Sequence, residues 1–218
     1  MMKINRDISI GGKNMSRIRK VNYGEMAIQA KRIREDGKQL NEQIVKAYTY
    51  LSDMHEFWYG KRYNKLVMAF NNMVPQLNEM LSLVVYKLPY SLELISNNYS
   101  MVDRKQKETA EIDEEPNRIK EIEITNDPGL RFLSDQVISI QQNISKCFEI
   151  AKDQMNEIEI EYKRIVWESE SADIFEEKFS EIKEKITAFF ANINTEFKNL
   201  MQQTEDDLEK AEKINNVG

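Results

Sequence analysis

Apolar residues recur three or four positions apart through most of this chain, the spacing that places them on one face of an α-helix. The pattern continues over long stretches because only 7 of the 218 residues are glycine and only 4 are proline. Long amphipathic helices bury a stripe of side chains, so they are stable only when several of them pack side by side. The sequence therefore predicts an all-α protein with an elongated core.

The first pair of predicted helices is joined by a turn at Gly60. Ser16 is a suitable N-cap for a helix that begins at the next residue and ends shortly before this turn. The second helix is predicted over about 62–101 and contains two prolines. Each proline removes a helical hydrogen bond, and we expect Pro89 rather than Pro75 to break the helix.

A charged segment, residues 104–126, follows the first hairpin and is predicted to be a linker. Asp127 is the predicted N-cap of a third helix, and a fourth helix follows a turn and ends near residue 215. We expect the two long antiparallel hairpins to pack as an elongated four-helix bundle. The predicted units are an N-terminal extension, a first hairpin, the linker and a second hairpin: 1–15, 16–103, 104–126 and 127–218.

Charge is distributed unevenly along the chain. Residues 1–109 hold 18 Lys and Arg against 11 Asp and Glu, a formal charge of +7, whereas residues 110–218 hold 13 against 26, a charge of −13. The two halves either attract each other or form separate solvated faces. The net charge of −6 argues against nucleic acid as a partner.

The residue types that most enzymes need are scarce. His55 is the only histidine and Cys147 the only cysteine, which argues against zinc sites, disulfides and catalytic triads. Since we also find no glycine-rich phosphate loop, we predict a non-enzymatic protein without cofactors. No stretch approaches the roughly 20 apolar residues of a membrane span, and the N-terminus lacks the apolar core of a cleaved signal peptide. We expect the protein to start in the cytoplasm without inserting into a membrane.

The two tryptophans, Trp58 and Trp167, stand 109 residues apart, and each lies at a predicted turn. When they are aligned, the apolar positions of the helices that follow also match. This agreement predicts that the two hairpins arose by duplication. The matched pairs are Leu66 with Phe175, Phe70 with Phe179, Met73 with Ile182, Leu77 with Ile186, Met80 with Phe189, Val84 with Ile193 and Leu88 with Phe197.

The first turn carries a recognisable motif. Trp58-x-Gly60 is followed by Phe70 and, 41 residues after the tryptophan, by Tyr99 and Asp103 in the spacing Y-x-x-x-D. A hairpin with these residues resembles the WXG family of type VII secretion substrates. Members of that family carry W-x-G at the turn, an aromatic or apolar residue in the second helix and Y-x-x-x-[D/E] as an export signal. The resemblance implies that Tyr99 and Asp103 form such a signal.

The second hairpin resembles the family less closely. Trp167 and Ser169 occupy its turn, with serine where the family has glycine. Leu208 and Glu212 stand where the tyrosine and the acid of a second signal would fall, so the acid is present and the tyrosine is absent. The resemblance therefore implies one complete signal and one degenerate signal in a tandem arrangement.

Family members pair antiparallel and present a turn tryptophan together with the partner's tail to the secretion ATPase. In this chain, such pairing would be intramolecular, and the short linker would favour it. It would bring Trp167 close to Tyr99 and Asp103, and Trp58 close to the degenerate signal at Leu208. The resemblance implies that the first of these sites is the working signal.

Three functional hypotheses follow. The leading one is a type VII secretion substrate, or a targeting partner for a larger toxin or another WXG-like protein, which is secreted without a cleaved signal peptide and is a monomer rather than a dimer. The alternative is a cytoplasmic coiled-coil scaffold or adaptor that is not exported and that forms oligomers. The third is a membrane-surface protein, for which only the basic residues within 13–38 offer a suitable face.

Overall fold

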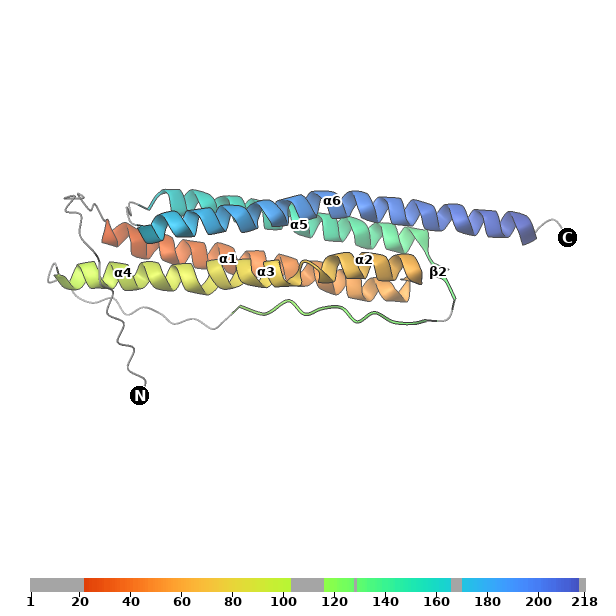
Figure 1. The fold of residues 1–218 in the computed structure, drawn as a ribbon, viewed down its shortest axis with the longest axis horizontal. Coiled ribbons are helices and arrows are strands. Elements are labelled where there is room, and N and C mark those ends of the chain that lie inside the picture. Colours follow the sequence, from red (N-terminus) through yellow and green to blue (C-terminus); the bar gives the residue numbers. More distant parts are fainter. Residues whose placement is uncertain (1–21, 103–115, 128, 166–169, 216–218) are drawn as a thin grey trace, which may run out of the picture.

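Four long helical rods lie side by side in the computed structural model, which describes residues 22–102, 116–127, 129–165 and 170–215 (Figure 1). The prediction of an all-α protein is confirmed, since the described strands are only two residues long. The first hairpin consists of α1 (Tyr23–Asp53) and a second rod built from α2 (Lys61–Asn71), α3 (Val74–Leu81), the π-helical segment η2 (Ser82–Lys87) and α4 (Leu88–Val102). The second hairpin consists of α5 (Ser134–Lys163) and α6 (Glu170–Asn215).

The start of α1 is set by a residue that the sequence did not single out. The predicted beginning of the helix, after Ser16, falls outside the described residues. In the described part, α1 begins at Tyr23, and the Asn22 side chain accepts a hydrogen bond from the backbone N–H of Glu25 at 3.3 Å. This bond satisfies one of the unpaired amide groups at a helix N-terminus, so Asn22 is an N-cap.

The second rod is interrupted at a different proline from the one predicted. The helix breaks at Asn72 and Met73, and Pro75 lies in the first turn of α3, where its missing N–H disturbs no hydrogen bond. At Pro89 the helix continues, so the prediction of a break there is wrong. The preceding π-helical segment η2 widens the hydrogen-bond spacing from four residues to five, which accommodates the proline without a break.

Gly37 of α1 lies directly against η2. A β-carbon at this position would lie 3.1 Å from the nearest side-chain carbons of Val84 and Val85, and 3.2 Å from the backbone carbonyl carbon of Val84. The glycine weakens the intrinsic helix propensity of α1 by about 1 kcal/mol. It also lets α1 and the π-helical segment approach more closely than any larger residue would allow.

The second hairpin begins later than predicted. The third helix was expected to start at Asp127, but α5 begins at Ser134. The residues before it form strand β2 (Arg131–Phe132), which pairs antiparallel with β1 (Trp58–Tyr59) at the turn of the first hairpin. Gly129, with a φ of 102°, turns the chain into this strand, so the backbone is extended where the sequence pattern predicted a helix.

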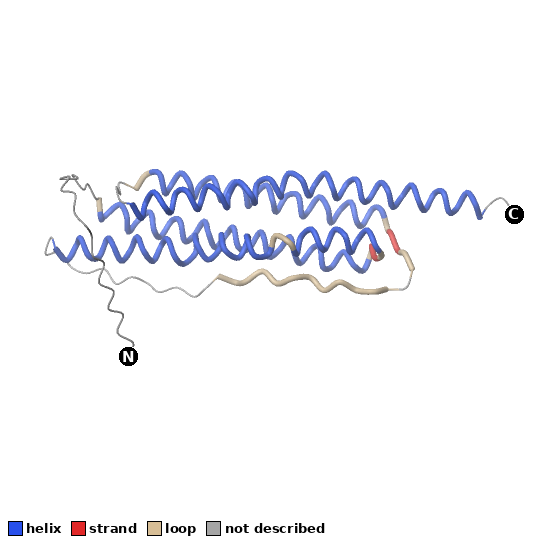
Figure 2. The backbone as a smooth tube through the Cα atoms, in the orientation of Figure 1, coloured by secondary structure: helices blue, strands red, loops and turns tan. Residues whose placement is uncertain are grey.

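Residues 116–127, which we call the strap, run in extended form along the first hairpin towards its turn (Figure 2). The remainder of the predicted linker, up to residue 115, lies outside the described residues. Ile119 of the strap is 4% exposed and belongs to the main hydrophobic core. The described part of the linker is therefore packed against the helices.

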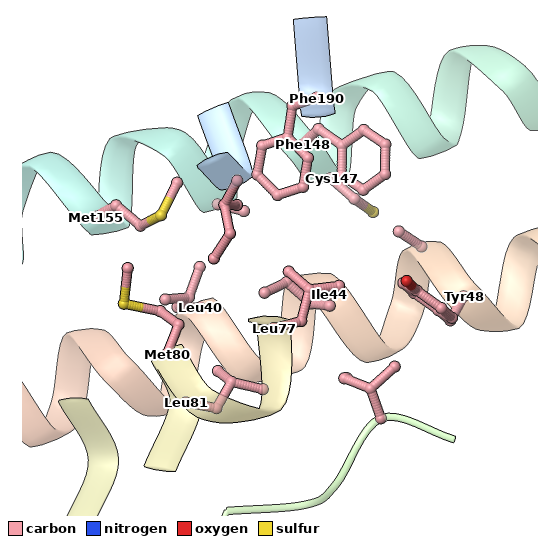
Figure 3. Packing of buried hydrophobic residues seen from close by; sticks show 14 of the residues in the cluster. Leu40, Ile44, Tyr48, Leu77, Met80, Leu81, Cys147, Phe148, Met155 and Phe190 are labelled. Carbon is pink, nitrogen blue, oxygen red and sulfur yellow. The ribbon is translucent and has the colours of Figure 1, made fainter. Parts of the chain in front are cut away.

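The two hairpins lie antiparallel, so that the turn of the first is at the end of the molecule where α5 begins (Figure 1). Helix α1 packs along α5 and α4, and α6 packs against α2, α3 and α5. Figure 3 shows Leu40 and Ile44 of α1 between Leu77 of α3 and Phe148 of α5. Buried side chains from all four rods form one continuous core.

Candidate functional site

Trp58, at the turn of the first hairpin, is completely buried, with 0% of its surface exposed. Its ring stacks on Phe197 of α6, with ring centroids 5.9 Å apart, and meets Phe132 edge-on at 5.5 Å and Tyr63 at 6.1 Å. These neighbours come from α6, β2 and α2. The tryptophan therefore joins the corner of the first hairpin to β2 and to α6, and a partner protein cannot touch it while the corner is closed.

Gly60, the last residue of the motif, has a φ of 119°, a conformation that side chains with a β-carbon rarely adopt. A β-carbon here would also lie 3.3 Å from Leu130 Cδ1. The turn is fastened further by the hydrogen bond from Leu133 N–H to the carbonyl of Phe57, at 2.9 Å. The backbone conformation of the turn therefore explains why the W-x-G motif has glycine at this position.

The strap is attached at the same corner by a polar cluster. His55 Nε2 lies 2.6 Å from Asp127 Oδ2 and 2.8 Å from Thr125 Oγ1, and the Thr125 hydroxyl donates to the same carboxylate. The hydrogen bond from Thr125, and after it the one from His55, holds the pKa of the Asp127 carboxyl below its usual value. These three residues tie the end of the strap to the turn of the first hairpin.

The degenerate signal of the second hairpin does not lie against Trp58. Leu208 is half-buried and Glu212 is exposed, and both follow Phe197, the residue on which Trp58 stacks. Leu208 is 11 residues further along, which corresponds to about 16 Å of helix. Helix α6 continues beyond the first turn, where Asp207 pairs with Arg62 (Figure 1). The sequence predicted that Trp58 would lie close to Leu208 and Glu212, whereas in the structure it contacts Phe197.

Tyr99 lies at the opposite end of the molecule, in the last turns of α4, with 39% of its surface exposed. One turn before it, Leu94 and Ile95 line a groove of about 440 Å³ together with Ile174 and Phe175 from the beginning of α6. The tail of the first hairpin and the beginning of α6 therefore come together. The other residues predicted for this site, Asp103, Trp167 and Ser169, lie outside the described residues.

The apolar groove between α4 and the beginning of α6 was not predicted from the sequence. Leu94 is 46% exposed and Ile174 is 59% exposed, and Lys87 and Lys178 also line the groove. Both residues lie outside the apolar stripes of their helices, since Leu94 stands between the buried Leu92 and Ser96 and Ile174 precedes the stripe residue Phe175. Their exposure depends on how far α4 and α6 overlap, which periodicity alone does not define.

Three asparagines of the second rod, which we call the asparagine ladder, hold the strap. The Asn78 side chain donates to the carbonyl of Ile119 and accepts from its N–H at 3.0 and 2.8 Å, and Asn71 does the same with Ile122 at 2.9 and 2.9 Å. Asn64 donates to a carbonyl of the strap at 2.9 Å. The ladder was missed by sequence reasoning, although asparagines seven residues apart were a visible signal.

The described residues were also compared with the requirements of a metal site, a membrane-spanning helix and a reactive thiol. Within them, no group of three or more His, Cys, Asp or Glu side chains is placed to hold a metal ion. None of the described helices combines the length and the apolar composition needed to cross a membrane. The thiol of Cys147 is buried in the core, and burial raises its pKa, so it is poorly suited to act as a nucleophile.

Comparison of the chain with protein-family models, with curated proteins and with solved structures found no match in any of the three.

Proposed function

We propose that this protein is a non-enzymatic substrate or targeting partner of a type VII secretion system, and that its export signal lies at the end of α4. The observation that supports the proposal is Tyr99: it is exposed, it lies 41 residues after Trp58, and the beginning of the second hairpin lies beside its helix. A half-exposed tyrosine offers a partner both an apolar ring and a hydroxyl.

The proposal assigns different roles to the two ends of the molecule. At the first turn, Trp58 and Gly60 stabilise the corner, and the ring of Trp58 is inaccessible. At the other end, Tyr99 and Asp103, together with Trp167 from the second turn, are the residues that the secretion ATPase would contact. The adjacent groove at Leu94 and Ile174 adds apolar surface to this end. We expect export without a cleaved signal peptide.

Export from cells that carry a type VII system tests the proposal. We expect Tyr99→Ala to abolish the appearance of the protein in the medium without changing its amount inside the cells, and Asp103→Ala to do the same. Tyr90→Ala is the matched control, because Tyr90 lies on the same helix, is half-buried and stacks on Tyr86. Undiminished export of both signal variants would refute the assignment.

Two further measurements separate the remaining hypotheses. Capture of proteins encoded nearby would distinguish a substrate, which is exported alone, from a targeting partner that binds a larger toxin. Light scattering would distinguish both from a cytoplasmic scaffold. A closed intramolecular bundle is expected to be a monomer of 25.7 kDa, whereas the scaffold is expected to be a stable dimer or larger oligomer.

A further inference from the structure

The asparagine ladder recognises main chain. A carboxamide side chain offers one donor group and one acceptor group, the complement of a residue's own C=O and N–H. Asn71 and Asn78 each use both groups on a single strap residue, Ile122 and Ile119 respectively. Because these bonds are made to the backbone, the hydrogen bonding of the ladder selects a backbone conformation and does not depend on the side chains of the bound segment.

The spacing of the ladder defines that conformation. Seven residues of a helical rod span about 10.5 Å, and three residues of an extended chain span about 9–10 Å. The contacts agree with these lengths. The ladder asparagines are seven residues apart, and they form hydrogen bonds with Ile119, Ile122 and Thr125, which are three residues apart. The same three residues are the least exposed from 117 to 127. A period of three is typical of a polyproline-II-like chain, whereas a β-strand would alternate with a period of two.

The strap leaves the site incompletely filled. Asn64 donates to the carbonyl of Thr125, but its own Oδ1 is buried and has no hydrogen-bond partner among the described residues. A groove of about 470 Å³ also remains between the strap and α1, lined on the α1 side by Val45, Tyr48 and neighbouring polar residues. A segment that offered its N–H to Asn64 and larger side chains to α1 would fit better than the strap does.

We propose that the asparagine ladder is a peptide-binding site, that the strap is its resident ligand, and that an extended segment of a partner protein replaces the strap. The partner segment carries aliphatic residues at the positions of Ile119 and Ile122, three apart, and a residue with a free backbone N–H at the position of Thr125. The inference is independent of the export hypothesis, because no ladder residue belongs to the predicted signal.

Replacement is compatible with the rest of the fold. The two hairpins are held together by α1 packing along α5 and by α6 packing on α2 and α3, so the strap can detach without separating the helices, and of the core only Ile119 leaves with it. The strap competes as an internal ligand at an effective concentration of about 1 mM. A partner segment therefore binds when its intrinsic affinity exceeds that of the strap or when its local concentration is comparably high.

A direct test uses a fluorescent peptide with the sequence of residues 116–127 and the full chain carrying Ile119→Ser and Ile122→Ser, which weaken the strap. We expect the peptide to bind this variant at least about tenfold more tightly than the unmodified chain. Adding Asn71→Ala should weaken binding about tenfold, because two hydrogen bonds are lost. Adding Asn72→Ala, at the exposed neighbouring position, should leave binding unchanged. Equal binding to the Asn71→Ala and Asn72→Ala forms, or no binding, would overturn the proposal.

Hydrogen exchange on the unmodified chain provides a second test that requires no substitution. The amides of Ile119 and Ile122 are bonded to the ladder, so they exchange only when the strap detaches. Unlabelled peptide at about 1 mM matches the strap's effective concentration and should occupy the ladder in about half of the molecules. For a strap that is otherwise closed at least nine-tenths of the time, both exchange rates should rise about fivefold or more. A peptide with serine at both isoleucine positions should have no effect. Unchanged rates with the native peptide would also overturn the proposal.

Discussion

At the scale of single residues, the corner of the first hairpin depends on shape and burial. Trp58 packs on Phe197, Phe132 and Tyr63, yet its indole N–H is buried and has no hydrogen-bond acceptor among the described residues. Its stabilising effect therefore comes from apolar area and ring packing, partly offset by the unsatisfied donor. Gly60 acts through backbone conformation alone.

Two substitutions of Trp58 separate ring packing from the polar group. Trp58→Phe keeps an aromatic ring and removes the unsatisfied N–H, so we expect the free energy of unfolding to fall by only about 1 kcal/mol. Trp58→Ala leaves a cavity next to Phe197 and should cost about 3–5 kcal/mol. Urea denaturation of both variants at pH 7 measures the difference. If Phe proved as costly as Ala, the N–H would have an essential partner and this account of Trp58 would be wrong.

Gly60→Ala tests the backbone argument. The substitution places a β-carbon on a residue with a φ of 119° and 3.3 Å from Leu130, so we expect a loss of about 1–2 kcal/mol in the free energy of unfolding. Gly24→Ala is the matched control, because a β-carbon there would meet only the Asn22 side chain, at 3.9 Å. The control should be neutral or slightly stabilising. Equal effects at Gly24 and Gly60 would contradict the argument.

At the scale of elements, the helices were predictable and their local exceptions were not. Periodicity is a local property, so it identified the rods, the end of α6 near residue 215 and buried positions such as Phe70 and Leu77. The strap and β2 are extended because residues distant in sequence bind their backbones. The ladder asparagines bind the strap, and the strand at Trp58 pairs with β2. The π-helical segment likewise depends on contact with Gly37, which is remote in sequence.

The candidate site was predicted only in part, for the same reason. The W-x-G motif correctly marked a turn, because glycine is needed where φ is positive. The exposure of Tyr99 and the neighbouring groove depend on the relative lengths and stagger of α4 and α6. The expected neighbours of Trp58 were wrong because antiparallel pairing was assumed to align the helix ends, whereas α6 continues past the turn beyond Phe197.

The contact between α1 and η2 gives a prediction at this scale. Gly37→Val forces branched carbons into the space now filled by Val84 and Val85, where even a single β-carbon would lie within 3.2 Å of backbone. We expect a loss of about 1–3 kcal/mol in the free energy of unfolding, despite the better helix propensity of valine. Gly24→Val, at an open position on the same helix, is the control and should change stability little. Urea denaturation measures the stability of both variants. If Gly37→Val left the free energy of unfolding unchanged, η2 would be able to move away from α1 without a cost in stability.

The attachment of the strap should depend on pH through Asp127. Its folded-state pKa is lowered, so the stabilisation is fully present above the unfolded carboxyl's pKa of about 3.9 and is lost as the pH falls through the folded value. We therefore expect the difference in unfolding free energy between the natural chain and Asp127→Asn to shrink as the pH falls below about 4. Thr125→Val, which removes the hydrogen bond that lowers this pKa most, should shrink the same difference. A difference that persists at pH 2 would contradict this origin.

At the scale of the whole molecule, the uneven charge of the sequence appears as ion pairs between the hairpins. In the described part of the chain, Arg62 pairs with Asp207, Lys65 with Glu196 and Arg32 with Glu161, each with the cation in the first hairpin and the acid in the second; Lys178 with Glu79 has the opposite sense. Single surface pairs contribute about 0–1 kcal/mol, so any sizeable effect must come from the summed charge of the two halves.

Salt dependence measures this summed attraction. Raising NaCl from about 0.02 to 0.3 M shortens the Debye length from roughly 20 Å to below 10 Å, which screens charges on facing hairpins. We expect the free energy of unfolding in urea to fall by about 1 kcal/mol over this range, because attraction between the halves is lost. The double variant Arg62→Gln, Lys65→Gln removes two of the cross-hairpin cations and should show a clearly weaker dependence. Lys213→Gln is the control, since its partner Glu209 lies on the same helix and neither residue forms an ion pair with the first hairpin in the described part of the chain. Stability that rises with salt would mean that self-repulsion within the acidic second hairpin outweighs its attraction to the first.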